Sequence, residues 1–406
     1  MREKKLLTCL GCICILLVLA GFPFTGYCSD PAPKTIKIGA VVSVTGAYAA
    51  GGRDLKAGYE LSVKHINADG GVYVKEFGKK LPIELILLDD ESDTTKTVSR
   101  MEKLYTVDKV LTYLGGFGSG MNVAQLATAE KNKVPWVGVT LAVDAPLKQG
   151  YKYTFRAWDN GTMDTESMIG VVESIPKDKR PAKLAYWELK DDWGIETGAA
   201  VRALCPKHGI EVVSYEKYSP STTDFSSLIL AARRAGAEIV YTTYIPPQSL
   251  TVPKQMKELG WRPKLHFSQR GPDLGGYWDA LREDANYILS CGTWDEAYKY
   301  PGNKRMVDDY YAENPRAKFI GLPVGAGYFA VQIVADAVKR AGTFDRNKIR
   351  DALAATDFIT IRGPIKFDKE NKAILKEGWR QWQNGKQVLV YPLEHAAGPV
   401  LLAPPW

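Results

Sequence analysis

Apolar runs alternate with stretches of helical spacing along the first third of the chain. Residues 35–44 form a run rich in β-branched residues, whereas 54–67 place Leu55, Tyr59 and Val63 on one helical stripe. The same alternation predicts further strands at 81–88, 110–114 and 135–139, and further helices at 94–108 and 121–132. A βαβα series of this kind predicts a parallel sheet covered by helices on both faces.

The same pattern restarts beyond residue 158. It predicts strands at 183–187, 210–215, 237–243, 264–268 and 286–291, with helices between them at 162–174, 193–208, 224–235 and 248–259. Three adjacent helices at 305–311, 325–341 and 346–354 and a late strand at 361–367 then follow. The pattern therefore predicts an α/β protein with two lobes joined by several crossings. The aromatic and proline-rich tail, 379–406, is expected to lie ordered on a surface.

The first 28 residues have the pattern of an export signal. A basic start at 1–5 precedes an apolar run at 6–20 whose one polar residue is Thr8, and small residues precede the expected cut after Cys28. This arrangement predicts a secretory signal peptide. One alternative is an uncleaved membrane anchor, for which the apolar run is short. The other is lipidation at Cys28, which the bulky Tyr27 disfavours.

Composition narrows the class of protein. The 406 residues are 45% hydrophobic and 24% charged, values typical of a folded chain rather than a disordered one. The formal net charge of +7 is scattered, so it does not favour a nucleic-acid partner. Two cysteines lie beyond the signal, Cys205 and Cys291. Export would allow them to form a disulfide, and two buried thiols are the alternative.

Catalytic and metal-binding signatures are absent from the sequence. The glycine-rich stretch 115–120 lacks the lysine of a phosphate loop, and Met121 and Gly118 replace key residues of the dinucleotide and hydrolase motifs. What remains is a strand-to-helix turn whose N–H groups suit a carboxylate, or a tight turn without a ligand. The four histidines show no paired-ligand spacing, and the acidic stretch 89–93 lacks an EF-hand pattern. We therefore expect no catalytic residue, metal or cofactor.

Aromatic residues gather in the loops that follow predicted strands. The chain has 10 Trp and 21 Tyr, and five of them lie in such loops: Tyr48, Trp158, Trp193, Tyr244 and Tyr277. Ligands of open α/β sheets bind at the carboxyl ends of the strands, where aromatic rings supply apolar walls. Each ring is a candidate wall of a small-molecule site, and ordinary packing is the alternative.

Several segments together resemble the periplasmic binding proteins of branched-chain amino acid transporters. The opening 36–48 resembles the first strand and binding loop of that family, and 114–119 is similar to its third-strand loop. Phe155-Arg156 resembles its first hinge crossing, and further similarities lie at 224–226, 341–353 and 363–368. The similarity covers nearly all of the mature chain, from about residue 34 to 375.

The resemblance implies a two-lobed fold, each lobe a parallel sheet flanked by helices, with three hinge crossings and a cleft that closes on ligand. Lobe 1 is expected at 34–155 plus 296–360, and lobe 2 at 156–295 plus 361–406. The βα pattern breaks near Arg156, Asp295 and Ile361, where we place the crossings.

The resemblance also implies ligand-binding residues. The family's carboxylate-binding positions resemble Ser119, Thr140 and Ala142 here, and a second-lobe aromatic cover resembles Tyr244. The loop aromatics Tyr48 and Trp193 complete the walls. Where the family has an acidic residue for the ligand's ammonium, this chain reads Gln269-Arg270-Gly271, with Asp273 following.

That departure leaves two ligand classes open. If Arg270 faces the cleft, it repels an ammonium and favours an organic acid, for which the loop aromatics suit an aromatic ring. If Arg270 faces solvent, Asp273 or Asp192 is free to meet the ammonium of an amino acid.

The resulting hypothesis is a periplasmic receptor for a branched-chain or related hydrophobic amino acid. It is expected to be a monomer that delivers its small carboxylate ligand to the permease and ATPase subunits of an ABC importer. A binding protein for an aromatic or other organic carboxylate is one alternative, and a sensor domain of the same fold is another. An extracellular enzyme would need a nucleophile and base, which the sequence does not offer.

Overall fold

Five parallel strands form the first sheet, in the order β4-β1-β5-β6-β7. β1 pairs with β4 from Ile36 opposite Ile83, and with β5 from Ile38 opposite Thr112. Apolar β-branched residues dominate β1, which is central and buried on both faces. The strands are β1 (Ile36–Val42), β4 (Ile83–Asp89), β5 (Thr112–Leu114), β6 (Trp136–Gly138) and β7 (Thr154–Arg156).

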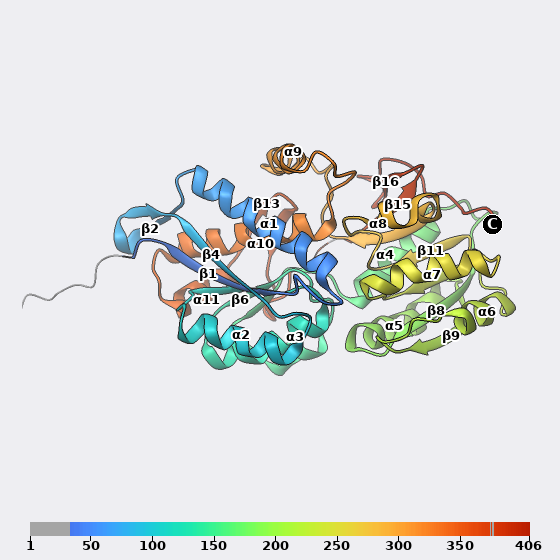
Figure 1. Cartoon of the computed structure of the whole chain (residues 1–406), viewed down its shortest axis with the longest axis horizontal. Helices are drawn as coiled ribbons and strands as arrows, with labels where there is room; N and C mark the ends of the chain where they lie inside the picture. Colours follow the sequence, from blue (N-terminus) through green and yellow to red (C-terminus); the bar gives the residue numbers. More distant parts are fainter. Residues whose placement is uncertain (1–32, 374, 376) are drawn as a thin grey trace, which may run out of the picture. The chain divides into compact units, whose positions relative to one another are not determined.

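Helices cover both faces of this sheet, as the sequence pattern predicts (Figure 1). α1 (Ala49–Ala68) and α10 (Leu322–Ala341) pack against each other on one face. α2 (Thr94–Thr106) and α3 (Ser119–Asn132) pack together on the other face. α11 (Arg346–Ala354) contacts α10, and α9 (Asn303–Glu313) contacts α1.

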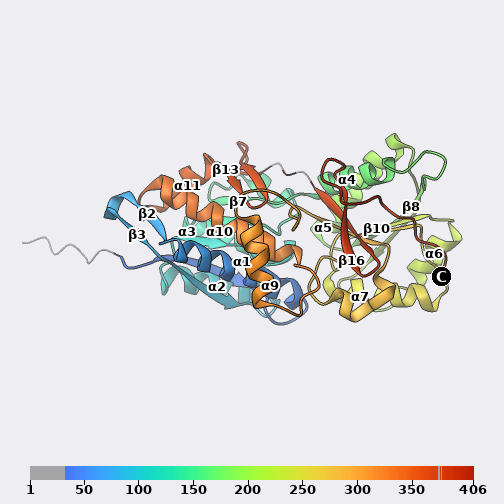
Figure 2. The same ribbon diagram turned by 90° about the horizontal axis from the view of Figure 1, so that it is seen from above.

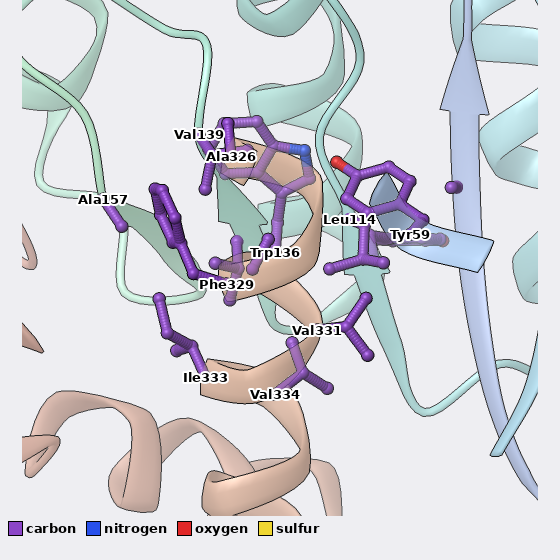
Figure 3. Packing of buried hydrophobic residues seen from close by; sticks show 14 of the residues in the cluster. Tyr59, Leu114, Trp136, Val139, Ala157, Ala326, Phe329, Val331, Ile333 and Val334 are labelled. Carbon is purple, nitrogen blue, oxygen red and sulfur yellow. The ribbon is translucent and has the colours of Figure 1, made fainter. Parts of the chain in front are cut away.

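The core of the first lobe lies between the sheet and α10. Figure 3 shows Phe329, Ile333 and Val334 of α10 and Trp136 of β6 in one hydrophobic cluster, and all four are fully buried. The buried hydroxyl of Tyr59 donates to the Gly115 carbonyl at 2.7 Å, so α1 is tied to the glycine-rich turn. Because that turn leads into the candidate site, core packing fixes the position of the site's backbone.

The second sheet has seven strands in the order β16-β15-β12-β11-β10-β8-β9. Five of them are parallel, and β15 pairs antiparallel with β12, as β16 does with β15. The tail is therefore more than a surface segment, because its hairpin extends the sheet and buries Trp379 and Trp382. The strands are β8 (Lys183–Leu189), β9 (Glu211–Tyr218), β10 (Ile239–Thr242), β11 (Leu265–Ser268), β12 (Ile288–Gly292), β15 (Gly378–Gln383) and β16 (Lys386–Tyr391).

Helices also cover both faces of the second sheet (Figure 2). α4 (Gly161–Glu173) and α5 (Asp192–Leu204) contribute to the core on one face. α6 (Ser226–Arg234) and α7 (Pro246–Glu258) contribute to the core on the other. The short helix α8 (Tyr277–Leu281) packs with Trp382 of the C-terminal hairpin.

Acidic residues cap the helices that follow two of the polar strand ends, as expected. The Asp93 carboxylate accepts from Lys96 N at 2.9 Å at the start of α2. The Asp191 carboxylate accepts from Gly194 N at 2.8 Å at the start of α5. Both bonds satisfy N–H groups that have no partner within the helix.

The chain passes between the two sheets three times. The first passage follows β7 and the second follows β12, close to the breaks near Arg156 and Asp295. The third passage lies later than the predicted break near Ile361. β13 (Asp357–Thr360) and β14 (Gly363–Lys366) form a hairpin, and Ile361 and Ile365 are buried in the first core. The return to the second sheet thus follows β14 rather than Ile361, and the lobe boundaries themselves stay a prediction.

The computed structural model describes residues 33–373, 375 and 377–406, and Lys34–Trp406 form one compact unit. The predicted signal peptide, including Cys28, lies outside these residues. No helix within the described ranges has the length and apolar character needed to cross a membrane. Cys205 and Cys291 are buried free thiols rather than a disulfide.

Besides the C-terminal hairpin, a short hairpin near the start of the first lobe has no counterpart in the sequence-based prediction. β2 (Val72–Val74) and β3 (Lys79–Leu81) are three residues each and pair antiparallel. Such short strands show too few alternations for periodicity to detect.

The contact between α1 and α10 gives the first prediction. A Cβ at Gly58 would collide with the Val324 carbonyl oxygen, which is backbone and cannot rotate away. Gly58→Ala is therefore expected to lower the free energy of unfolding by about 1–3 kcal/mol, the range for overpacking a close contact. Urea unfolding followed by circular dichroism measures the change.

Gly120→Ala is the matched control. Gly120 also lies in a helix, but a Cβ there meets nothing within 4 Å. Its free energy of unfolding is expected to stay constant or rise by about 0.5–1 kcal/mol. Equal losses for the two variants would refute close packing as the cause.

Candidate functional site

Ser119, Thr140 and Ala142 meet at the carboxyl end of the first sheet. Ser119 begins α3 and is only 5% exposed, and its Oγ accepts a hydrogen bond from Ala142 N at 3.1 Å. The Ser119 hydroxyl proton is then available to a ligand. Gly118 has φ 96°, so the left-handed backbone that presents Ser119 suits glycine.

Thr140 makes its hydrogen bonds within the lobe. Its hydroxyl donates to the Gly116 carbonyl at 2.5 Å and accepts from Asn122 Nδ2 at 2.9 Å. These bonds hold the two loops of the site together. The Thr140 side chain thus stabilises the loops of the site through hydrogen bonds within the first lobe. Its role as a direct ligand contact stays a prediction.

Arg270 lies between aromatic rings from both lobes. Its guanidinium carbon is 4.4 Å from the ring centroid of Trp193, at the start of α5, and 4.9 Å from that of Phe117, in the glycine-rich turn. The residue is only 7% exposed. A desolvated guanidinium over two ring faces is a strong cation–π arrangement. The Arg270 side chain is therefore directed into the space between the lobes and not toward solvent.

Acidic and phenolic groups surround this guanidinium. Burial raises the pKa of Tyr48, and the charge of Arg270 opposes that rise. Burial also raises the pKa of Asp191, although the hydrogen bond from the Gly194 N–H and the charge of Arg270 act to lower it. Burial raises the pKa of Asp273 to about 6, again with Arg270 opposing. The cleft thus holds a buried cation together with carboxyl groups of weakened acidity.

The two acidic residues considered as ammonium partners differ in position. Asp273 is 4% exposed, and its Oδ1 accepts from Gly271 N at 2.6 Å. Asp192 is exposed on α5. Asp273 is therefore the one of the two that the fold buries.

Tyr244 lies inside the second lobe. It is fully buried and packs edge-on against Phe225, and its hydroxyl is 3.4 Å from His266 Nε2. The structure thus brings Tyr48, Trp193 and Arg270 together with Phe117, while Tyr244 packs in the core beneath α6 and α7. Its predicted role as a ligand cover stays a prediction.

Two carboxylates hold the lobes together directly. Glu196 of α5 accepts from Asp144 N at 2.8 Å and from Ala145 N at 2.7 Å, in the loop after β6. Asp54 of α1 accepts from Gly275 N at 2.9 Å, and burial raises its pKa to about 6. Both carboxylates act as acceptors for backbone N–H groups of the opposite lobe.

A groove of ≈ 330 Å³ opens between the same two regions. This volume suits a small organic molecule. Two prolines begin α7 and offer no N–H to the groove, so that wall is apolar. The lining residues include Ala49, Ala50 and Arg53 from α1, Pro246 and Leu250 from α7, and Leu274 and Tyr277.

A buried carboxyl cluster lies where the crossings meet. Ligand atoms of Asp164, Cys291 and Glu377 lie within 4.8 Å of one another, a spacing that a metal would require. Three arginines act electrostatically on these carboxyl groups, namely Arg156, Arg270 and Arg362. Positive charge from these three arginines next to the cluster disfavours a divalent cation there.

A family model described as periplasmic binding protein matches residues 35–381, most of the chain. The chain belongs to the periplasmic binding protein family. The Leu/Ile/Val-binding protein homolog 7 of Brucella abortus is 26% identical to this periplasmic binding protein over 382 residues, with 89% of this chain and 92% of that protein covered. Homolog 8 of Brucella suis is 26% identical over 404 residues, with coverages of 94% and 95%.

Solved structures agree on the fold. The branched-chain amino acid transporter substrate binding protein LivJ of Streptococcus pneumoniae, in complex with isoleucine, has a TM-score of 0.77 at 23% identity, with 87% of this chain and 98% of that chain covered. A solute binding protein of an ABC transporter from R. palustris, in complex with benzoate, has a TM-score of 0.74 at 20% identity, with coverages of 90% and 97%. At these identities the similarity establishes the two-lobed fold.

Sequence reasoning missed several residues of the site. Phe117 lies within the glycine-rich turn, so its position could have been noticed from that motif. Glu196, Asp54 and Glu377 are single acidic residues with no motif around them. Only the tertiary structure brings them to the interlobe contacts and to the crossings.

The Glu196 contact gives the second prediction. Glu196→Ala removes the acceptor of two backbone N–H groups and so favours lobe separation over closure. Ligand affinity is expected to fall about tenfold, because hydrogen bonds to a charged group contribute about 1.5–3 kcal/mol. Isothermal titration calorimetry measures the change.

Glu211→Ala serves as the control, since Glu211 is an exposed residue of β9. Its affinity is expected to match the wild type. An unchanged affinity in Glu196→Ala would show that the Glu196 contact does not favour closure.

Proposed function

We propose that this periplasmic binding protein is the exported solute receptor of an ABC importer. Its cleft takes up a small carboxylate and closes over it, and the closed protein docks on the permease and ATPase subunits. The two-lobed fold with three passages between the sheets supports hinge closure of this kind. The receptor acts as a monomer and performs no reaction on its ligand.

The observation that carries the choice of a carboxylate is the buried Arg270 guanidinium between Trp193 and Phe117. A guanidinium kept from water needs an anionic or acceptor partner, and its planar fork matches a carboxylate. The Ser119 hydroxyl, whose oxygen is held by the Ala142 N–H, supplies a further donor from the first lobe. Donors from both lobes would then converge on one acidic group.

A branched-chain or related hydrophobic amino acid is the first candidate ligand. The names of the Brucella relatives and the isoleucine complex of LivJ support it. The groove offers apolar surface to an aliphatic side chain at Ala49, Leu250 and Leu274. Arg270 and Ser119 lie outside its described lining. An α-ammonium would require one of the buried carboxylates near Arg270, with Asp273 the nearest in sequence.

An organic acid without an ammonium is the second candidate, and the position of Arg270 favours it. This cation faces the cleft where the family is expected to place an acidic residue. The benzoate complex of a structural relative supports an aromatic acid. Trp193, Phe117 and Tyr48 offer ring surfaces for it.

The third prediction separates the two candidates. If the ligand is an organic acid, benzoate binds the wild type and Arg270→Ala lowers its affinity at least tenfold, since a buried charged hydrogen bond is lost. Competition calorimetry with leucine, isoleucine and benzoate measures this. Tight leucine binding that survives Arg270→Ala but disappears in Asp273→Ala would establish the amino-acid receptor instead.

The fourth prediction concerns the first-lobe donors. Ser119→Ala removes a hydroxyl that has a free proton for the ligand, so affinity should fall by about 1–2 kcal/mol. Titration calorimetry with the preferred ligand tests it, and Ser99→Ala on the exposed surface of α2 is the control. An unchanged dissociation constant in Ser119→Ala would place carboxylate binding elsewhere.

A further inference from the structure

Three buried carboxyl groups gather where the chain passes between the sheets. Asp159 lies in the first passage just after β7, Asp164 lies on α4, and Glu377 lies at the end of the third passage. Their exposed fractions are 1%, 1% and 4%. The cluster, defined as Asp159, Asp164 and Glu377, therefore joins two of the three segments that must bend when the lobes move.

These carboxyl groups have too few hydrogen-bond donors. One oxygen of Asp159, one of Asp164 and both of Glu377 are buried without a partner among the described residues. Carboxylate oxygens of Asp164 and Glu377 lie within 4.8 Å of each other, and Asp159 acts on Glu377 as a further neighbouring carboxyl group. Two carboxylates cannot share a hydrogen bond unless one is protonated. The geometry therefore calls for a proton within the cluster.

The surrounding charges do not replace that proton. Arg156 is paired with Asp144 at 2.5 Å, and Arg270 is stacked on Trp193 and Phe117. The single side-chain donor bonded to the cluster is an amide, since Gln269 Nε2 donates to Asp164 Oδ2 at 2.5 Å in the described part of the chain. The titratable or charged groups that act on the cluster or on its thiol neighbour are Arg156, Arg270, Arg362, Tyr241, Cys291, Tyr298 and Asp273.

The acidity of the cluster follows from its burial. Burial raises the pKa of Asp159, and it raises the pKa of Asp164 and of Glu377 well above the usual range. The negative charge of Asp159 adds to the rise for the other two. Loss of burial would remove the main cause of all three shifts.

Closure of the lobes controls that burial. Trp193 and Arg270, which stack on each other, both act on Asp164 and so form its cover toward the first lobe. Both are held by the first lobe, since Arg270 lies on Phe117 and Trp193 packs in the first core. When the lobes separate, these covers lose their support and water reaches the carboxyl groups.

We propose that closure of this receptor on its ligand takes up a proton from solvent onto the Asp159–Asp164–Glu377 cluster, so that ligand binding is linked to pH. The inference rests on the proposed ligand-driven closure. The proton comes from water or buffer and is held by a carboxylate oxygen, and no covalent bond to carbon changes. Affinity should therefore fall as the pH rises from the pKa of the open state toward the raised pKa of the closed state, because the closed state binds more protons than the open one.

Calorimetry in two buffers tests the linkage directly. Isoleucine and benzoate are each titrated at pH 7 in phosphate and in Tris, whose ionisation enthalpies differ widely. The binding enthalpy of the wild type should differ between the buffers by an amount that corresponds to uptake of up to about one proton per ligand. Identical enthalpies in both buffers for a probe that binds would overturn the proposal.

Glu377→Gln distinguishes the effect of an ionisable group in the cluster from the effect of the size of its side chain. The amide keeps the size of the side chain but cannot ionise, so the variant should bind the probe with a much smaller buffer dependence and a flatter pH profile. Glu211→Gln, on the exposed edge of β9, should behave as the wild type. Should Glu377→Gln fail to fold, Asp159→Asn makes the same test. Full buffer dependence in a folded cluster variant would refute the assignment.

A ligand-free measurement keeps the two proposals distinguishable. A carboxyl group with a raised pKa contributes stability below its unfolded pKa, and that stability is lost as pH rises toward the folded value. When the pH is raised from 5 to 8, the thermal unfolding midpoint of the wild type should thus decrease. The midpoint of Glu377→Gln should decrease less over the same range. If neither isoleucine nor benzoate binds, the proposed ligand classes are wrong. The change of the thermal midpoint with pH still decides whether the cluster is protonated. An equal change of thermal midpoint with pH in the wild type and in Glu377→Gln would overturn the proton-sharing cluster. Zinc binding by the wild type that is lost in Glu377→Gln would overturn it as well.

Discussion

Parallel strands place the loops at their carboxyl ends on one edge of each sheet, and the rest of the cleft depends on that constraint. The turn that holds Phe117 and Ser119 follows β5, and the loop that holds Thr140 and Ala142 follows β6. Arg270 follows β11 in the same way in the other lobe. Backbone hydrogen bonding thus fixes which side chains meet before any side chain contributes affinity. The Arg270 guanidinium then lies against aromatic rings from both lobes, so the contact between the lobes contains a buried positive charge.

Periodicity predicted most of the fold, because buried parallel strands and amphipathic helices have distinct spacings. It predicted β1, β4 and most of the longer helices of both lobes, but it missed the start of α1 and the short α8. It placed the third crossing too early, since Ile361 and Ile365 read as part of a strand but not as part of a particular core. The C-terminal hairpin was difficult for the same reason: Trp379 and Trp382 look like surface aromatics until their antiparallel partner strands are known.

The site was predictable only where a motif or a loop position identified it. Ser119, Trp193 and Arg270 lie at predicted strand ends, and the structure brings them to the space between the lobes. The orientation of Arg270 could not be read from the sequence, because solvent and cleft are equally compatible with its neighbours Gln269 and Gly271. The carboxyl cluster is beyond sequence reasoning altogether, since Asp159 and Glu377 are more than 200 residues apart.

The hydrophobic core of each lobe includes an element from the C-terminal part of the chain, and this limits when the core can form during synthesis. α10 supplies a large share of the first core, and the β15–β16 hairpin completes one edge of the second sheet. A nascent chain that ends before residue 322 therefore lacks essential parts of both lobes, however much of it has left the ribosome. Such a chain cannot fold stably until its synthesis is almost complete. That delay would keep it unfolded long enough to be threaded through a translocation channel, which is what a secreted protein requires.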